Sequence, residues 1–108
     1  MSIFGQKKKG SEVKILVREK SDYNDIYVMQ KGSNREMWFR KKNDFFLQSR
    51  IDINKLDTLI LVNTKLLISA LLLQPAPRRI LMIGLGGCAV SNFLSRLYPH
   101  AIIDVVEI

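Results

Sequence analysis

The pattern of apolar and polar positions predicts short β-strands in the first half of the chain. Apolar residues recur at every second position over residues 13–17, which is the period of a strand with one buried face. Residues 25–29 are rich in β-forming side chains, and the turn-forming cluster after them contains Gly32, a residue that tolerates positive φ. Residues 36–40 then return as the partner strand. The sequence therefore predicts a β-hairpin within a small antiparallel β region over residues 12–50.

A helical spacing replaces this alternation in the middle of the chain. Between residues 52 and 73 the apolar positions form one wide face of a helix: Leu56, Leu59, Ile60, Leu66, Leu67, Ala70 and Leu71. Pro75 and Pro77 follow, and proline cannot continue the hydrogen-bond ladder of a helix. Residues 51–77 are therefore predicted to form a helix and a proline-containing linker.

The pattern changes a third time after this linker. Residues 80–83 form a continuous apolar run, as expected for a strand that is buried on both faces of a parallel sheet. After a glycine-rich break, residues 89–97 have the spacing of a short amphipathic helix, and residues 101–107 form a second apolar strand. The predicted fold class is α/β, with the antiparallel region followed by the first βαβ unit of a Rossmann-like sheet over residues 78–108, truncated at its second strand.

Composition and charge narrow the class of protein. The chain has 108 residues, 47% of them hydrophobic and 25% charged, which fits one soluble globular domain. Its net charge of +7 lies partly in short runs such as residues 7–9 and 40–42. We expect these runs to be solvated, and nucleic acid is not an expected partner because no aromatic residues interleave with residues 7–9. Residues 1–11 are predicted to be a flexible tail.

The cysteine content and the hydropathy of the chain indicate a cellular location and exclude some partners. Cys88 is the single cysteine, which is consistent with a reducing, cytoplasmic location. The apolar run at residues 66–73 is far shorter than the ~20 residues that a membrane helix needs, so a membrane is not an expected partner. A metal is not expected either, because no second cysteine or histidine has ligand spacing.

The glycine-rich break between strand and helix has the chemistry of a nucleoside site. Gly84 to Ala89 fit the pattern G-x-G-x-x-[G/A] between a strand and a helix. Gly84 permits the tight turn, Gly86 lets a ligand approach the backbone, and the small Ala89 lets helix and strand pack closely. Glu107 ends the second strand about 20 residues further on, where a carboxylate can accept both ribose hydroxyls. NAD and S-adenosyl ligands both fit this pattern.

Three segments carry a resemblance to a known family. RRILMIGLGGCAVSNFLSRLYPHAIIDVVEI resembles the start of the catalytic domain of spermidine synthases, the polyamine aminopropyltransferases. Upstream, SDYNDIYVM resembles the family's first conserved strand, and LQSRIDINKLDTL resembles the segment that leads into its first helix. The resemblance extends from about Glu12 to the end of the chain. It implies the N-terminal portion of a spermidine-synthase-like protein.

This resemblance also implies an activity and partners. The family has an N-terminal β-domain, often used in oligomer contacts, and a methyltransferase-like fold, so a homo-oligomer is expected. Its members transfer an aminopropyl group from decarboxylated S-adenosylmethionine to a diamine in polyamine biosynthesis. Glu107 matches the family's ribose-binding acid, and Gly84 and Gly86 match its glycine turn. Gly87, in the same turn, is a further candidate ligand-binding residue. Asn24 stands where the family commonly has a donor-binding glutamine. Gln48 matches a ligand-contacting glutamine, although a surface role at a strand end is equally open.

The sequence also departs from the family pattern. Gly87 stands where an acid usually holds the cationic amine, Cys88 replaces a further glycine, and Asn63 replaces an aromatic residue. No catalytic residue is assigned, because the family's catalytic aspartate falls beyond Ile108, and the chain by itself is expected to be inactive.

Three alternatives to aminopropyl transfer remain. They are a methyltransferase-like protein that uses S-adenosylmethionine, an NAD-binding fragment of an oxidoreductase, and a non-catalytic, oligomerising remnant. The β-rich region before the glycine turn disfavours the NAD-binding alternative.

Overall fold

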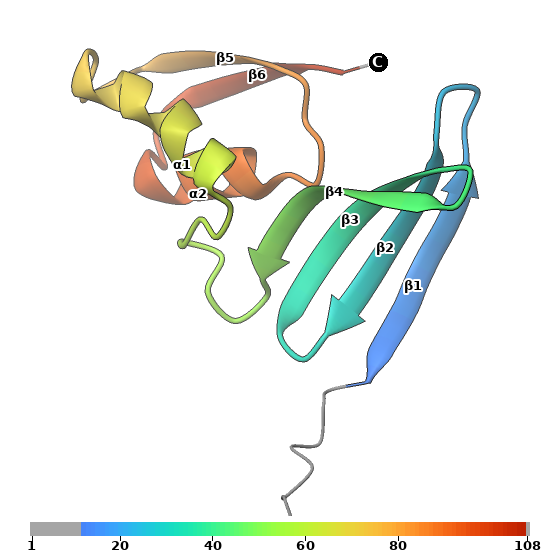
Figure 1. The fold of residues 1–108 in the computed structure, drawn as a ribbon. Helices are drawn as coiled ribbons and strands as arrows, with labels where there is room; N and C mark the ends of the chain where they lie inside the picture. Colours follow the sequence, from blue (N-terminus) through green and yellow to red (C-terminus); the bar gives the residue numbers. More distant parts are fainter. Residues whose placement is uncertain (1–11, 108) are drawn as a thin grey trace, which may run out of the picture.

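The computed structural model describes residues 12–107 and contains two sheets with a helical segment between them (Figure 1). A four-stranded antiparallel sheet forms the N-terminal half, and two parallel strands with a helix between them form the C-terminal part. The α/β prediction is confirmed at this level. The flexible tail predicted for residues 1–11 lies outside the described residues.

The N-terminal sheet is a simple meander. Its strands β1 (Val13–Lys20), β2 (Asp25–Lys31), β3 (Asn34–Lys41) and β4 (Asp44–Asp52) pair antiparallel in chain order. The turn between β2 and β3 contains Gly32 at φ 60°, a left-handed conformation that glycine adopts at little cost. The hairpin predicted from the sequence is therefore confirmed, within a sheet of four strands.

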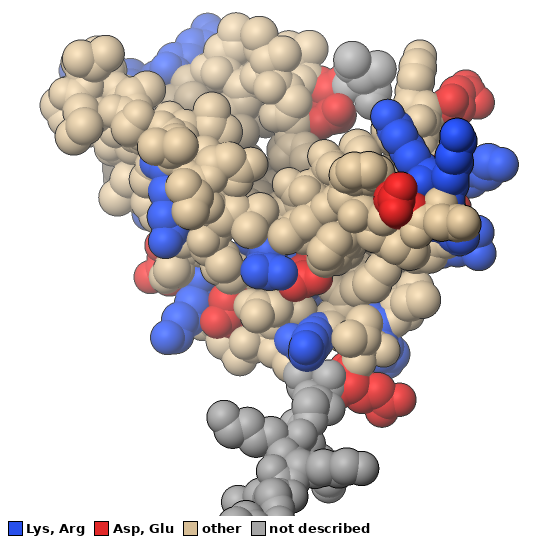
Figure 2. All heavy atoms as spheres, viewed as in Figure 1, with Lys and Arg blue, Asp and Glu red and all other residues tan. Residues whose placement is uncertain are grey.

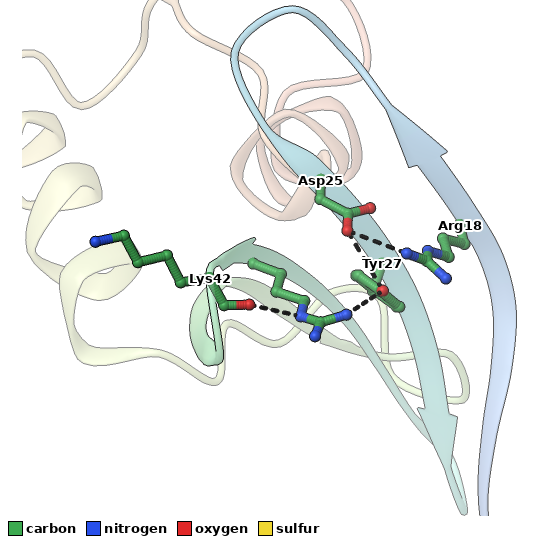
Figure 3. Close-up of polar contacts among 5 residues, drawn as sticks. Arg18, Asp25, Tyr27 and Lys42 are labelled. Atoms are coloured by element: carbon green, nitrogen blue, oxygen red, sulfur yellow. Dashed lines mark hydrogen bonds and ion pairs between the residues drawn. The ribbon is translucent and has the colours of Figure 1, made fainter.

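On one face of this sheet, side chains from neighbouring strands contact one another (Figure 3). The Tyr27 side chain is buried, and its ring meets Phe45 edge-on at a centroid distance of 5.1 Å. The guanidinium of Arg18 lies 5.2 Å from the centroid of the Tyr27 ring, and its Nη2 is 3.3 Å from Oδ2 of Asp25. This hydrogen bond raises the pKa of Arg18 above its ordinary value. Arg40 donates a hydrogen bond of 3.3 Å to the Tyr27 hydroxyl. The aromatic rings of this face are thus covered by cations of the same sheet.

The helical segment is shorter than the sequence predicted. Residues 53–61 form turns and irregular structure, followed by α1 (Val62–Leu67) and the 3₁₀-helix η1 (Ile68–Leu72). The prediction of a helix is therefore wrong for residues 53–61. Oδ1 of Asp52 accepts a hydrogen bond of 2.9 Å from the backbone N–H of Asn54. Such a local side-chain bond stabilises a turn in competition with a helix, although the apolar spacing is helical.

The C-terminal part is a βαβ unit, as predicted. The strands β5 (Arg79–Ile83) and β6 (Ile102–Val106) are parallel, and α2 (Ala89–Leu97) connects them. The prediction that β5 is buried on both faces is wrong for this chain, because Leu81 is 65% and Ile83 85% exposed. Figure 1 shows α1 and α2 on the same side of the two strands. The opposite side therefore lacks a helical cover among the described residues.

The uncovered face of the βαβ unit is largely apolar, although it also carries the ion pair between Arg79 and Asp104. The register pairs Ile83 with Val106, so these two side chains lie on one face with Leu81 and Ile102. All four are exposed. In the view of Figure 2, the surface over α1, η1 and the two strands carries few charged side chains, and Lys and Arg gather on the four-stranded sheet. Contiguous exposed apolar surface is a common feature of interaction sites.

We predict that the chain associates in solution through this uncovered face. Size-exclusion chromatography with light scattering is expected to show dimers or larger species. Ile83→Lys is expected to shift the population toward monomer, because a lysine there places a charge in the apolar contact. The fold tolerates this change, since Ile83 is already largely exposed.

The matched control is Ile15→Lys, which changes an exposed isoleucine on the edge strand of the other sheet. This variant is expected to associate like the unchanged chain. A cooperatively melting monomer at all concentrations would contradict the prediction, and an equal effect of both lysines would assign the association to another surface.

Candidate nucleoside-binding site

The loop between β5 and α2 has the backbone shape that its glycines predict. Gly84 has φ 87° and Gly86 has φ 55°, both in the left-handed region. The backbone N–H of Gly84 donates a hydrogen bond of 2.7 Å to the carbonyl of Val106, which ties the turn to the end of β6. No heavy atom lies within 4 Å of the position that a Cβ would take at either glycine. The backbone is therefore open to close approach by a ligand.

The side chain of Glu107 connects the end of β6 to the same loop. Its Oε2 accepts hydrogen bonds from the backbone N–H groups of Leu85 and, at 3.3 Å, of Gly86. Backbone N–H groups that donate to a carboxylate make stronger bonds than those that donate to a neutral acceptor. Glu107 is therefore fixed at the rim of the glycine turn, where the sequence analysis placed the ribose-binding acid.

A cavity of about 710 Å³ lies between this loop and the N-terminal sheet. This volume is in the range of small-molecule sites, which is roughly 300–1,000 Å³. Three groups of residues line the cavity, namely Leu85, Gly86 and Glu107 from the βαβ unit, Ile26, Met37 and Phe39 from the inner face of the sheet, and Ser21, Asp22, Tyr23 and Asn24 from the β1–β2 turn. The site is thus built jointly by the two sheets.

A second cavity, of about 380 Å³, lies between the helices and β5. Aliphatic side chains of α1, η1, β5 and α2 form most of its lining, including Leu71, Ile80 and Leu94. Specific ligand sites combine apolar walls with a few convergent polar groups. This cavity is better explained as loosely filled core.

The structure brings some of the predicted site residues together and leaves others apart. Asn24, Gly86 and Glu107 line the 710 Å³ cavity, and Gly84 shapes the loop without lining it. Gln48 does not line it. Its side chain is exposed on β4, and its Nε2 donates a hydrogen bond of 3.2 Å to the carbonyl of Phe46. Of the two readings left open for Gln48, the surface role agrees with this position.

Gly87, the remaining candidate ligand-binding residue, does not line the cavity and instead has a packing function that the sequence pattern did not predict. A Cβ on Gly87 would lie 2.5 Å from Oγ and 2.6 Å from Cβ of Ser49, which is only 6% exposed on β4. The loop can rest on β4 only because residue 87 has no side chain. An acid at this position, as in the family pattern, has no room while Ser49 keeps its place.

The sequence analysis also missed most of the wall opposite Glu107. Asp22 and Tyr23 precede Asn24 in the β1–β2 turn and line the cavity with it, and Met37 and Phe39 add an apolar surface from β3. The alternation of β3 indicates which side chains share a face. The alternation does not indicate which face of β3 lies against the glycine loop. This wall could therefore be identified only from the tertiary structure.

These observations define an α/β protein with a glycine-rich turn and a carboxylate beside a cavity between two sheets. The chain is similar to the polyamine aminopropyltransferase of Vibrio vulnificus, with 36% identity over 95 residues. The alignment includes 87% of this chain and 32% of the relative, so the chain spans about a third of the relative's length. The resemblance to the aminopropyltransferase family is thereby confirmed. No family model and no solved structure matches the chain.

Residues 12–107 contain no group of three or more His, Cys, Asp or Glu side chains that could hold a metal ion. No helix in this part of the chain is long and apolar enough to cross a membrane.

Cys88 yields a prediction about stability. This residue precedes α2 with φ 65°, a left-handed conformation that costs side chains other than glycine about 1–2 kcal/mol. Cys88→Gly removes this strain but adds freedom to the unfolded chain, so we expect a net gain of up to ~1 kcal/mol in the free energy of unfolding. Cys88→Val is expected to lower that free energy, because β-branched residues disfavour positive φ.

Urea denaturation of the three proteins measures these changes. Gly86→Ala is the matched control, because the space around residue 86 is open and only its φ of 55° opposes alanine. It is expected to cost about 1–2 kcal/mol. The strain argument would be wrong if Cys88→Gly were clearly less stable than the unchanged chain.

Proposed function

We propose that residues 12–107 form the nucleoside-binding part of an aminopropyltransferase-like protein, and that the βαβ unit begins a Rossmann-like, methyltransferase-type sheet. The observation that carries this proposal is the convergence of Glu107, Gly86 and Asn24 on one cavity between two sheets. Glu107 would accept hydrogen bonds from the ribose hydroxyls, and the open backbone at Gly86 would admit the ligand. The Asn24 amide would contact the ligand from the opposite wall.

The charge of the cavity favours an S-adenosyl ligand over NAD. Asp22 and Glu107 are its charged lining residues, and no Lys or Arg among residues 12–107 lines it. A pyrophosphate would bring negative charge against these carboxylates, whereas the positive sulfonium of an S-adenosyl compound complements them. The apolar wall of Ile26, Met37 and Phe39 suits the methylene groups around the sulfur. The proposed ligand is therefore decarboxylated S-adenosylmethionine or S-adenosylmethionine, with a diamine as the acceptor in the family reaction.

A non-catalytic role is the second candidate. Two observations favour it, namely the uncovered apolar face of β5–β6 and the contact between Gly87 and Ser49, which leaves no room for an amine-binding acid. In this case the chain would bind a nucleoside or another copy of itself without transferring a group.

Titration calorimetry with 5′-methylthioadenosine tests the proposed site. We expect a dissociation constant above about 1 μM, which corresponds to a binding free energy weaker than about −8 kcal/mol. Glu107→Ala is expected to weaken binding at least ~10-fold, because it removes the acceptor of the ribose hydroxyls and the bonds that hold the loop. NAD is not expected to compete.

Asp104→Asn is the matched control. Asp104 lies on β6, the strand that leads to Glu107, but it does not line the cavity. Its Oδ2 accepts a hydrogen bond of 2.8 Å from Arg79. This variant is expected to bind like the unchanged chain. Binding that survives Glu107→Ala would refute the site, and a submicromolar dissociation constant would show that more of the pocket is present than proposed.

A further inference from the structure

The β1–β2 turn forms one wall of the cavity, and the hydroxyl of Ser21 determines its shape. Oγ of Ser21 accepts hydrogen bonds from the backbone N–H groups of Tyr23, at 3.3 Å, and Asn24, at 3.0 Å. The same hydroxyl is 3.2 Å from the carbonyl of Asn24, to which it can donate. The backbone N–H of Ser21 also donates to this carbonyl, at 2.8 Å. A serine hydroxyl has one donor and two acceptor sites, so these bonds use its full capacity.

The strands on either side of the turn are held independently of Ser21. Lys20 at the end of β1 pairs with Asp25 at the start of β2. Arg18 adds an ion pair to Asp25 on the face opposite the cavity, which Figure 3 shows beside Tyr27. Loss of the Ser21 hydroxyl should therefore loosen the turn without separating the strands.

Packing alone does not hold the cavity-lining side chains of the turn. Tyr23 lines the cavity although it is 77% exposed, and Asn24 is half-buried. An exposed side chain on a mobile turn loses conformational freedom when a ligand orders it, which weakens binding. The hydrogen bonds of Ser21 reduce this loss, because they fix the backbone of both residues before a ligand arrives.

We infer that Ser21 is a positioning residue of this site, whose hydroxyl holds Tyr23 and Asn24 as the wall that faces Glu107. This inference rests on the proposed nucleoside-binding function. Ser21 acts through the turn, and its contribution is the preorganisation of that wall. A purely structural role would change stability without changing affinity, so both must be measured.

The test compares Ser21→Ala, Ser21→Thr and the matched control Ser33→Ala in the full chain. Ser33 lies in the β2–β3 turn of the same sheet and does not line the cavity. Calorimetry measures the affinity for 5′-methylthioadenosine, NMR measures the hydrogen exchange of the Asn24 amide, and thermal melting confirms folding. Ser21→Ala is expected to raise the dissociation constant and the exchange rate, each roughly 10-fold. Ser21→Thr should restore both, and Ser33→Ala should change neither.

The outcomes separate this inference from the proposed function. Unchanged exchange at Asn24 in Ser21→Ala would overturn the positioning role, whatever the affinity. Faster exchange with unchanged affinity, while Glu107→Ala still abolishes binding, would overturn the inference and leave the proposed site intact. If the unchanged chain bound no 5′-methylthioadenosine, the proposed function would fail, and the role of Ser21 toward a nucleoside would fail with it.

Discussion

The contact between Gly87 and Ser49 is the constraint on which the arrangement of the molecule depends. Ser49 is buried on β4, and the glycine loop lies so close to it that a Cβ on residue 87 would overlap its side chain. This close approach places the inner face of the four-stranded sheet opposite the glycine turn. The 710 Å³ cavity lies between these two surfaces. A glycine that matches an amine-binding position in the family pattern thus joins the two halves of the protein here.

Backbone geometry, more than burial, shapes the two walls of this cavity. On one side, left-handed glycines and the carboxylate of Glu107 keep the loop open. On the other side, the hydroxyl of Ser21 closes the β1–β2 turn. In both cases a side-chain oxygen accepts hydrogen bonds from backbone N–H groups, and such bonds commonly order irregular segments. The residues that line the cavity can therefore lie near the surface and still have defined positions.

The βαβ unit, in contrast to the polar turns around the cavity, exposes apolar side chains. Its two parallel strands present exposed apolar side chains on the face away from α1 and α2. Parallel strands normally have helices on both faces, and removing apolar surface from water is favourable. The same strands that position the glycine turn therefore favour association. Nucleoside binding and self-association are expected of the same short unit for separate physical reasons.

The sequence determined those features that depend on local chemistry. The alternation over residues 13–17 and the turn at Gly32 predicted the antiparallel hairpin, because strand period and turn conformation are properties of neighbouring residues. The motif at Gly84 and Gly86, with Glu107 after the next strand, predicted the glycine turn and the carboxylate beside it for the same reason.

Only the tertiary structure decided how distant segments meet. Helical spacing extended the predicted helix into residues 53–61, where the side-chain bond from Asp52 stabilises a turn instead. Burial of β5 on both faces was expected from its apolar run, yet burial depends on which elements cover a strand and not on its composition. Whether Gln48 and Tyr23 line the cavity depends on how the four-stranded sheet meets the glycine loop, which Gly87 contacts at Ser49. That contact joins residues far apart in the chain, so no local pattern could have revealed it.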